Sequence, residues 1–193
     1  MTKIPFPLAH DAAYMLRANL FDGVMRCELV GFLRIAESYL DSGADADIDE
    51  WEVGGIELLA IPNIGRVRHT RGSSNHNFLI ERLNALGYPY EYTDEKVTFY
   101  APTPSESIWI PVRLWLTALE NFGYDYFLRT GTNAFVQSVC IPQSAGGWLK
   151  EGIKLGNGVW QGEQKVICLT EAQFFREAFG REVIAPHLRK EAI

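Results

Sequence analysis

The segment that most constrains the fold reads VGGIELLAIPNI and spans residues 53–64. Its run of aliphatic residues predicts a buried strand, and Pro62 marks the end of that strand because proline lacks the N–H that a strand ladder needs. Three further strands are expected downstream, with polar turns between them. Their sequences are YPYEY, VTFYAP and IWIPVRLWLT. The middle of the chain is therefore predicted to be rich in strands.

Apolar residues recur at helical spacing in two segments, one before this region and one within it. Residues 8–21 predict a helix that ends at Asp22-Gly23. Residues 77–87 predict a second, amphipathic helix, for which Asn75 or Asn77 is the expected N-cap.

The C-terminal third is expected to be mainly helical. Residues 118–140 predict two helices joined by a turn at 129–131, and a small hairpin is expected around 161–162. Thr170 followed three residues later by Gln173 forms a capping box before the last helix, which Gly180 ends.

The three remaining segments are expected to be one strand and two polar loops. Residues 25–35 are expected to be a strand that runs into a glycine-containing turn. Residues 37–50 are interpreted as a solvated acidic loop, and residues 66–76 as a polar loop. Helices and strands in this order predict the α+β class.

The net charge, the apolar runs and the cysteine and histidine positions argue against several classes of protein. With 18 Lys and Arg against 24 Asp and Glu, the net charge is 18 − 24 = −6, which disfavours an indiscriminate nucleic-acid binder. No apolar run is long enough for a transmembrane helix, and the N-terminus does not resemble a signal peptide. The three cysteines are far apart and the four histidines are scattered, so we expect a cytoplasmic protein without a zinc site or disulfides.

Four segments together resemble the DNA polymerase β-like (X-family) nucleotidyltransferases. They are CELVGFLR (27–34), VGGIELL (53–59), IPVRLWL (110–116) and RTGT (129–132). The resemblance implies a mixed sheet flanked by helices, forming a palm over residues 1–128, and a small thumb-like lobe over residues 129–193. It also implies that Arg34, Arg129, Thr130 and Gly131 contact a nucleotide or its phosphates.

The chain departs from that family where the chemistry takes place. Three carboxylates hold two divalent metals in the family, and their counterparts here are Gly55, Glu57 and Arg113. The phosphate-binding serine falls at Phe32. Only Glu57 remains as a residual catalytic carboxylate, so no cofactor is expected. An ion pair between Glu57 and Arg113 is the structural interpretation of the same two residues.

An alternative alignment keeps a metal pair. Asp47-Ile48-Asp49 spells the Asp-x-Asp dyad and follows Gly31 at a tolerable distance. Asp47 and Asp49 would then bind Mg²⁺, which is the only cofactor this hypothesis brings. The competing interpretation is a solvated acidic loop.

Two sets of residues are candidates for contact with nucleic acid or with another partner. The densest basic cluster contains Arg66, Arg68 and Arg71, next to glycine and serine residues whose N–H groups suit phosphate. Trp148 and Trp160 lie in glycine-rich surroundings that predict exposure. The other interpretations are a soluble loop and core aromatics.

Two hypotheses for function follow. The first is a catalytically degenerate nucleotidyltransferase-fold protein that binds a protein or nucleoprotein partner, for example a phage-type, anti-CRISPR-like inhibitor in the host cytoplasm. The second is a nucleotide- or DNA-binding protein, or an active enzyme with rearranged metal ligands. The acidic balance favours a basic partner.

Overall fold

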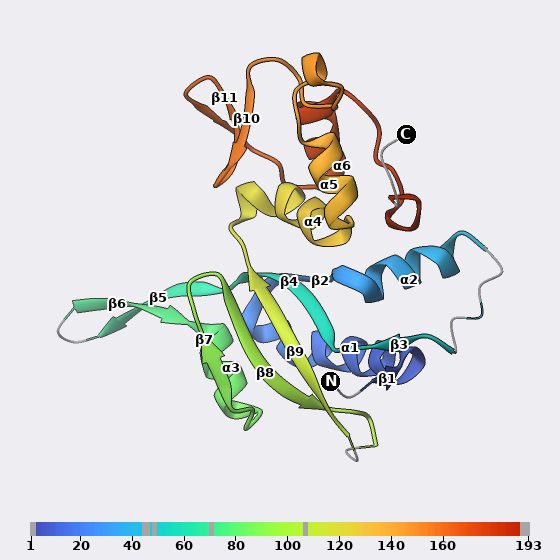
Figure 1. Cartoon of the computed structure of the whole chain (residues 1–193). Coiled ribbons are helices and arrows are strands. Elements are labelled where there is room, and N and C mark those ends of the chain that lie inside the picture. Colours follow the sequence, from blue (N-terminus) through green and yellow to red (C-terminus); the bar gives the residue numbers. More distant parts are fainter. Residues whose placement is uncertain (1–2, 44–46, 48–49, 70–71, 106–107, 190–193) are drawn as a thin grey trace. The chain divides into compact units, whose positions relative to one another are not determined.

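The computed structural model describes residues 3–43, 47, 50–69, 72–105 and 108–189 (Figure 1). It contains two compact units, which are described separately. The first comprises residues 1–29 and 47–117, and the second comprises residues 30–46 and 118–193. The predicted α+β class, with a mixed sheet flanked by helices, is confirmed.

A five-stranded mixed sheet forms the centre of the first unit, and its strands run in the order β2-β4-β9-β8-β7. They are β2 (Val24–Leu29), β4 (Ile56–Pro62), β9 (Trp109–Leu116), β8 (Lys96–Pro102) and β7 (Tyr90–Tyr92). The pair β4 and β9 is parallel, and the other three pairs are antiparallel. The strands expected from the sequence are therefore present.

Side chains alternate between the two faces of this sheet. Val97 and Phe99 on β8, and Val112 and Leu114 on β9, are buried. Helices α1 (Phe6–Leu20) and α3 (Phe78–Ala85) lie on that face (Figure 1). We call the opposite face the outer face. It carries Lys96, Thr98, Tyr100, Trp109, Pro111, Arg113 and Trp115.

The predicted helices of this unit are confirmed. Helix α1 is followed by a 3₁₀ turn at Phe21–Gly23. Asn77 caps α3, because its side-chain oxygen accepts hydrogen bonds from the backbone N–H groups of Leu79 and Ile80. Short strands β1 (Ile4–Pro5) and β3 (Glu52–Val53) pair beside α1.

The polar loop expected at residues 66–76 is instead largely a hairpin. Strands β5 (Ile64–His69) and β6 (Gly72–Asn77) pair antiparallel, and Figure 1 shows them extending away from the five-stranded sheet. The sequence did not predict these strands, because the segment lacks the apolar alternation that usually indicates a strand.

The second unit begins with a helix that the sequence interpretation missed. Helix α2 (Gly31–Asp41) occupies the expected turn and the first part of the expected acidic loop. Leu33 and Ala36 face its core side, and Arg34 pairs with Glu37 one turn away. This i,i+3 ion pair offsets part of the acidic charge that made the segment look like a loop.

The rest of the second unit follows the predicted order. The helices are α4 (Phe122–Thr130), α5 (Asn133–Val139) and α6 (Glu171–Phe174), with a π-helical continuation at Phe175–Phe179 and 3₁₀ turns at Leu119–Asn121, Gln143–Ala145 and Pro186–Leu188. Strands β10 (Ile153–Gly156), β11 (Gly158–Gln161) and β12 (Gln164–Val166) form a three-stranded sheet. The capping box at Thr170 and Gln173 is confirmed, as is the end of the helix at Gly180.

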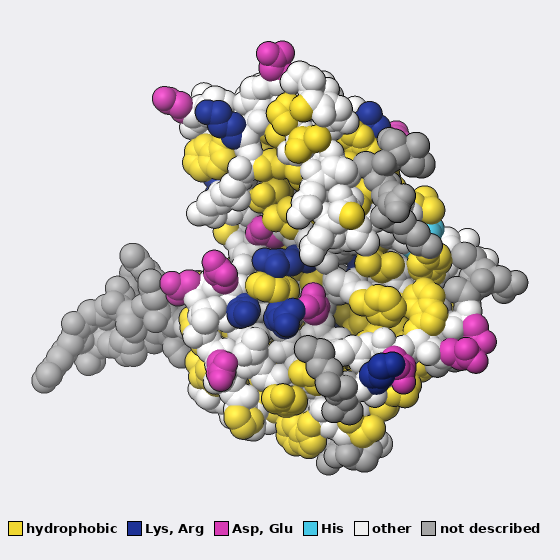
Figure 2. Space-filling model, in the orientation of Figure 1, with side chains coloured by type: hydrophobic (Ala, Val, Ile, Leu, Met, Phe, Trp, Pro, Cys, Tyr) yellow, Lys and Arg dark blue, Asp and Glu magenta, His cyan; other side chains and the backbone are white. Residues whose placement is uncertain are grey.

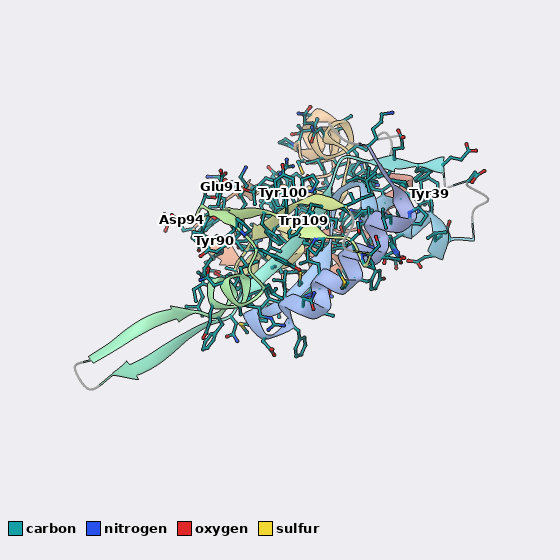
Figure 3. All side chains as sticks on the ribbon, turned by 90° about the horizontal axis from the view of Figure 1, so that it is seen from below. Tyr39, Tyr90, Glu91, Asp94, Tyr100 and Trp109 are labelled. Carbon is teal, nitrogen blue, oxygen red and sulfur yellow. The ribbon has the colours of Figure 1, made fainter. Side chains whose placement is uncertain are left out.

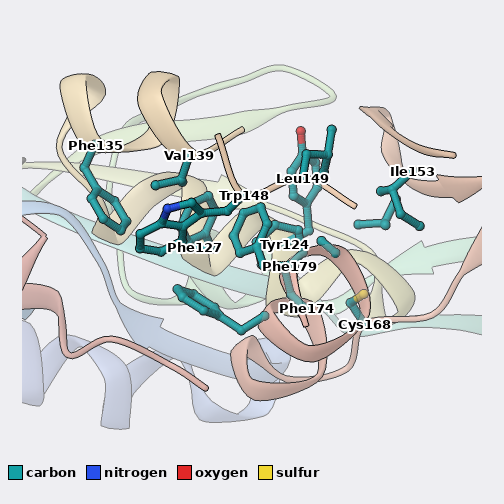
Figure 4. Close-up of a cluster of buried hydrophobic side chains, with 13 residues drawn as sticks. Tyr124, Phe127, Phe135, Val139, Trp148, Leu149, Ile153, Cys168, Phe174 and Phe179 are labelled. Carbon is teal, nitrogen blue, oxygen red and sulfur yellow. The ribbon is translucent and has the colours of Figure 1, made fainter. Parts of the chain in front are cut away.

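Aromatic rings fill the core of this unit (Figure 4). The ring of Phe127 lies 4.9 Å from that of Phe174 and 5.6 Å from that of Phe179, centroid to centroid. Trp148 packs edge-on against Phe135 and Phe179 and is only 8% exposed. The expected exposure of Trp148 is therefore wrong, because the glycines beside it allow the chain to turn the ring inward.

A fully buried arginine lies against this aromatic core. Arg189 pairs with Glu171 at 2.8 Å and donates to the hydroxyl of Thr130 at 2.6 Å. Its guanidinium also donates twice to the carbonyl of Ile184. Because each of these acceptors is satisfied by the same cation, removing it would leave a carboxylate and polar oxygens without their partner.

We expect Arg189→Met to lower the free energy of unfolding by about 3–5 kcal/mol, since it leaves Glu171 without its buried partner. The measurement is urea denaturation followed by circular dichroism. The control is Arg176→Ala, which removes a side chain that is 69% exposed and should change stability by less than about 1 kcal/mol. Equal effects of the two substitutions would contradict this assignment.

Candidate functional site

Parallel pairing of β4 and β9 brings Glu57 and Arg113 together. They are direct partners in the register, and their side chains form an ion pair at 2.5 Å. The expected ion pair is therefore present. It is not buried, because the side chains of Arg113 and Glu57 are 48% and 33% exposed. A pair this accessible to water contributes about 0–1 kcal/mol, so it does little to hold the sheet together.

A tryptophan completes this group on the outer face. The guanidinium of Arg113 lies 5.6 Å from the ring centroid of Trp115, and the ammonium of Lys96 lies 5.5 Å from it. Figure 2 shows Lys and Arg side chains gathered around a hydrophobic group in this region. We call Glu57, Lys96, Arg113 and Trp115 the sheet site. Cations beside an aromatic ring can hold an anionic or aromatic group, but a single ion-paired carboxylate is not a metal-ligand set.

Gly55 shows why this sheet does not hold a metal pair. A Cβ atom placed on Gly55 would lie 2.6 Å from the carbonyl oxygen of Pro111, closer than real side chains approach. A carboxylate cannot occupy this position unless the β4 and β9 backbones separate. With no room at Gly55 and a cation at Arg113, the residues present do not fit the two Mg²⁺ ions of the resembled family.

The alternative metal pair is described only in part. Asp47 is exposed, and Asp49 lies outside the described residues. Within the part of the chain that the structure describes, no three His, Cys, Asp or Glu side chains come together as a ligand set. The hypothesis of a displaced pair therefore stays a prediction.

The residues that the resemblance assigns to nucleotide contact lie in the second unit, where several have internal partners. The Arg34 guanidinium donates to the Tyr126 hydroxyl at 2.8 Å and to Glu37 at 2.9 Å. Thr130 is fully buried and its hydroxyl binds Arg189, while Arg129 is partly exposed in the last turn of α4. The nucleotide role of these residues remains a prediction.

Gly131 is suited to this turn by its small size and not by its backbone conformation. Its φ of −88° and ψ of 150° are open to any residue, so backbone freedom is not the reason for glycine. A Cβ there would lie 2.7 Å from the side chain of Val136. The position therefore requires glycine because α5 packs closely against the turn.

The remaining candidates are separated from the sheet site along the chain. Arg66 and Arg68 are residues of strand β5, whereas Arg71 lies outside the described residues. Trp160 is partly buried on β11, opposite Lys165 of β12. Their partner contacts stay predictions.

Two groups were missed from the sequence. Lys96 was not predicted as a site residue, although period-two alternation along β8 and β9 is the signal that places Lys96 and Trp115 on exposed positions of their strands. The cluster of Arg189, Glu171 and Thr130 has no local signal, because its members are far apart in sequence.

Comparison with known proteins found no matching family profile and no curated protein of significant sequence similarity. Among the described residues, no helix is both long enough and apolar enough to cross a membrane.

We expect Gly55→Ala to destabilise the protein by about 1–3 kcal/mol, because the added methyl group forces β4 away from Pro111. Gly156→Ala is the matched control, since nothing lies within 4 Å of a Cβ at that position. Thermal unfolding of the two variants measures the difference. A neutral Gly55→Ala would show that the two strands can separate freely.

The cysteines should be unreactive in the native protein. Burial raises the pKa of the Cys27 thiol to about 12, and those of Cys140 and Cys168 to about 11. Because each thiol stays protonated well above neutral pH, a thiol reagent at pH 8 should label all three only after unfolding in guanidinium. Rapid labelling without denaturant would contradict this.

Proposed function

We propose that this chain is a nucleotidyltransferase-like protein that does not catalyse transfer and acts by binding a protein or nucleoprotein partner. A phage-encoded inhibitor of a host nucleic-acid machine is one concrete form of this proposal. It depends on the resemblance of the sheet to a polymerase β-like palm and on what has replaced the catalytic residues.

The order of elements supports the resemblance. Helix α1 and strand β2 are followed by a helix that starts at Gly31, and strand β4 carries Glu57. Strand β9 lies parallel to β4 and places Arg113 directly beside Glu57. A family that holds metals between carboxylates on neighbouring strands needs this same adjacency.

The close approach of Gly55 to the carbonyl of Pro111 is the main support for a loss of catalysis. The first carboxylate position has no space for any side chain, and the third carries a cation that neutralises the remaining carboxylate. Mg²⁺ needs several oxygen ligands, and one ion-paired glutamate cannot provide them. The fold would then serve as a scaffold for binding.

Nucleotide or DNA binding is the second candidate function. Trp115, with Lys96 and Arg113 beside its ring, favours it, because a base can stack on tryptophan while cations contact phosphate. Isothermal calorimetry with nucleoside triphosphates and with gapped DNA at low salt tests this candidate. Heat that disappears in Trp115→Ala would support it, and no heat would remove it.

The main proposal is tested by a nucleotidyl-transfer assay. We expect the wild-type protein to extend no primer and transfer no nucleotide with either Mg²⁺ or Mn²⁺, because Gly55 and Arg113 leave no place for a metal pair beside Glu57. An active polymerase in the same buffer is the positive control. Turnover that vanishes in Glu57→Ala would overturn the proposal, because Glu57 would then act as a metal ligand.

A further inference from the structure

Strand β7 forms one end of the five-stranded sheet. One side pairs with β8 through Tyr90↔Phe99, Glu91↔Thr98 and Tyr92↔Val97. Among the described residues, no strand pairs with its other side. The outward backbone groups of a terminal strand can accept a further strand from another chain.

The opposite edge of the sheet is protected, which makes β7 the distinctive one. On β2 the register shifts between Val24 and Arg26, and the Arg17 side chain donates to the carbonyl of Cys27 at 3.0 Å. Irregular pairing and an arginine against the backbone both hinder the addition of a strand. The β7–β8 register has no such irregularity, and tyrosine favours strands.

The side chains around β7 indicate what kind of segment fits. Glu91, Asp94 and Glu95 are exposed, and Figure 2 shows acidic side chains beside the turn between β7 and β8. Between residues 90 and 96 the charge is three acids against Lys96, or −3 + 1 = −2. Phosphates would be repelled here, whereas lysine or arginine side chains would be attracted.

Two tyrosines add contact area to this edge. Tyr92 is 43% exposed and Tyr100 on the neighbouring β8 is 58% exposed. Figure 3 shows Tyr90, Glu91 and Asp94 at the same end of the sheet, and the register places Glu91 and Tyr100 on its outer face. Exposed tyrosines beside carboxylates are suited to the aliphatic stems and charged ends of basic side chains.

We propose that β7 binds an extended segment of a partner protein that carries lysine or arginine at alternate positions, as a sixth strand of the sheet. This inference rests on the proposed function and specifies the partner's chemistry. Backbone hydrogen bonds to Tyr90–Tyr92 supply the register. Basic side chains on the outer face meet Glu91 and Tyr100, and those beyond the strand meet Asp94 and Glu95.

The first test uses fluorescent peptides as probes and anisotropy as the readout. A peptide in which lysine alternates with valine should bind the wild-type protein. The same peptide with glutamate in place of lysine should not bind, and neither should a single-stranded oligothymidine. A protein that binds the oligonucleotide but not the lysine peptide would overturn the proposal in favour of nucleic acid.

The second test separates strand addition from simple charge attraction. Two versions of the lysine peptide are methylated on alternate backbone nitrogens, one on the lysines and one on the valines. Only one set of N–H groups can face β7, so one version should bind at least about tenfold more weakly and the other should bind nearly as well as the parent. Equal affinities of the two would overturn strand addition.

The third test locates the site on the protein. Glu91→Lys should weaken the parent peptide by roughly fivefold or more, because it reverses a charge at the centre of the edge. Glu163→Lys makes the same change at an exposed turn of the second unit and should leave binding unaltered. Equal effects of the two variants would overturn the location, provided circular dichroism shows both to be folded. None of these outcomes depends on the transfer assay, so the two proposals can fail separately.

Discussion

The chemistry of the sheet depends on how closely β4 approaches β9. At Gly55 the two backbones are so near that only a hydrogen atom fits between the glycine and the carbonyl of Pro111. Parallel pairing then continues without a break through Glu57 and Arg113. A metal site would require these strands to present carboxylates around a cation-sized space. Here the same space is closed by backbone at one position and by a guanidinium at the next.

Closing that space changes what the outer face can recognise. The outer face carries a charge pair, a lysine and an indole ring, so it can hold an anionic or aromatic group. Three further acidic side chains, Glu91, Asp94 and Glu95, lie at the β7 edge and its turn. Within one sheet, the residues that suit anions and those that suit cations are thus carried by different strands.

The sequence predicted the parts of the fold that have local signals. The strands around Leu58 and Val112, the cap at Asn77 and the capping box at Thr170 were all expected, because each is encoded within a few residues. The adjacency of Glu57 and Arg113 was expected only through the family resemblance. The closure at Gly55 and the burial of Arg189 depend on contacts between distant segments, which no local pattern reports. Helix α2 was missed because its acidic residues concealed an amphipathic pattern.

The chain passes between the two units more than once, and this has a consequence for how it folds. Helix α2 belongs to the second unit, yet it is followed by residues 47–117 of the first. During synthesis α2 emerges early, while its partners on α4 and in the Pro186–Leu188 turn come much later. Tyr126 follows Arg34 by 92 residues, and His187 follows Ser38 by 149. Until α4 and the Pro186–Leu188 turn have been synthesised, the apolar side of α2 lacks these packing partners. No single cut separates the two units, because a cut after residue 117 leaves α2 with the first unit and a cut after residue 29 leaves residues 47–117 with the second.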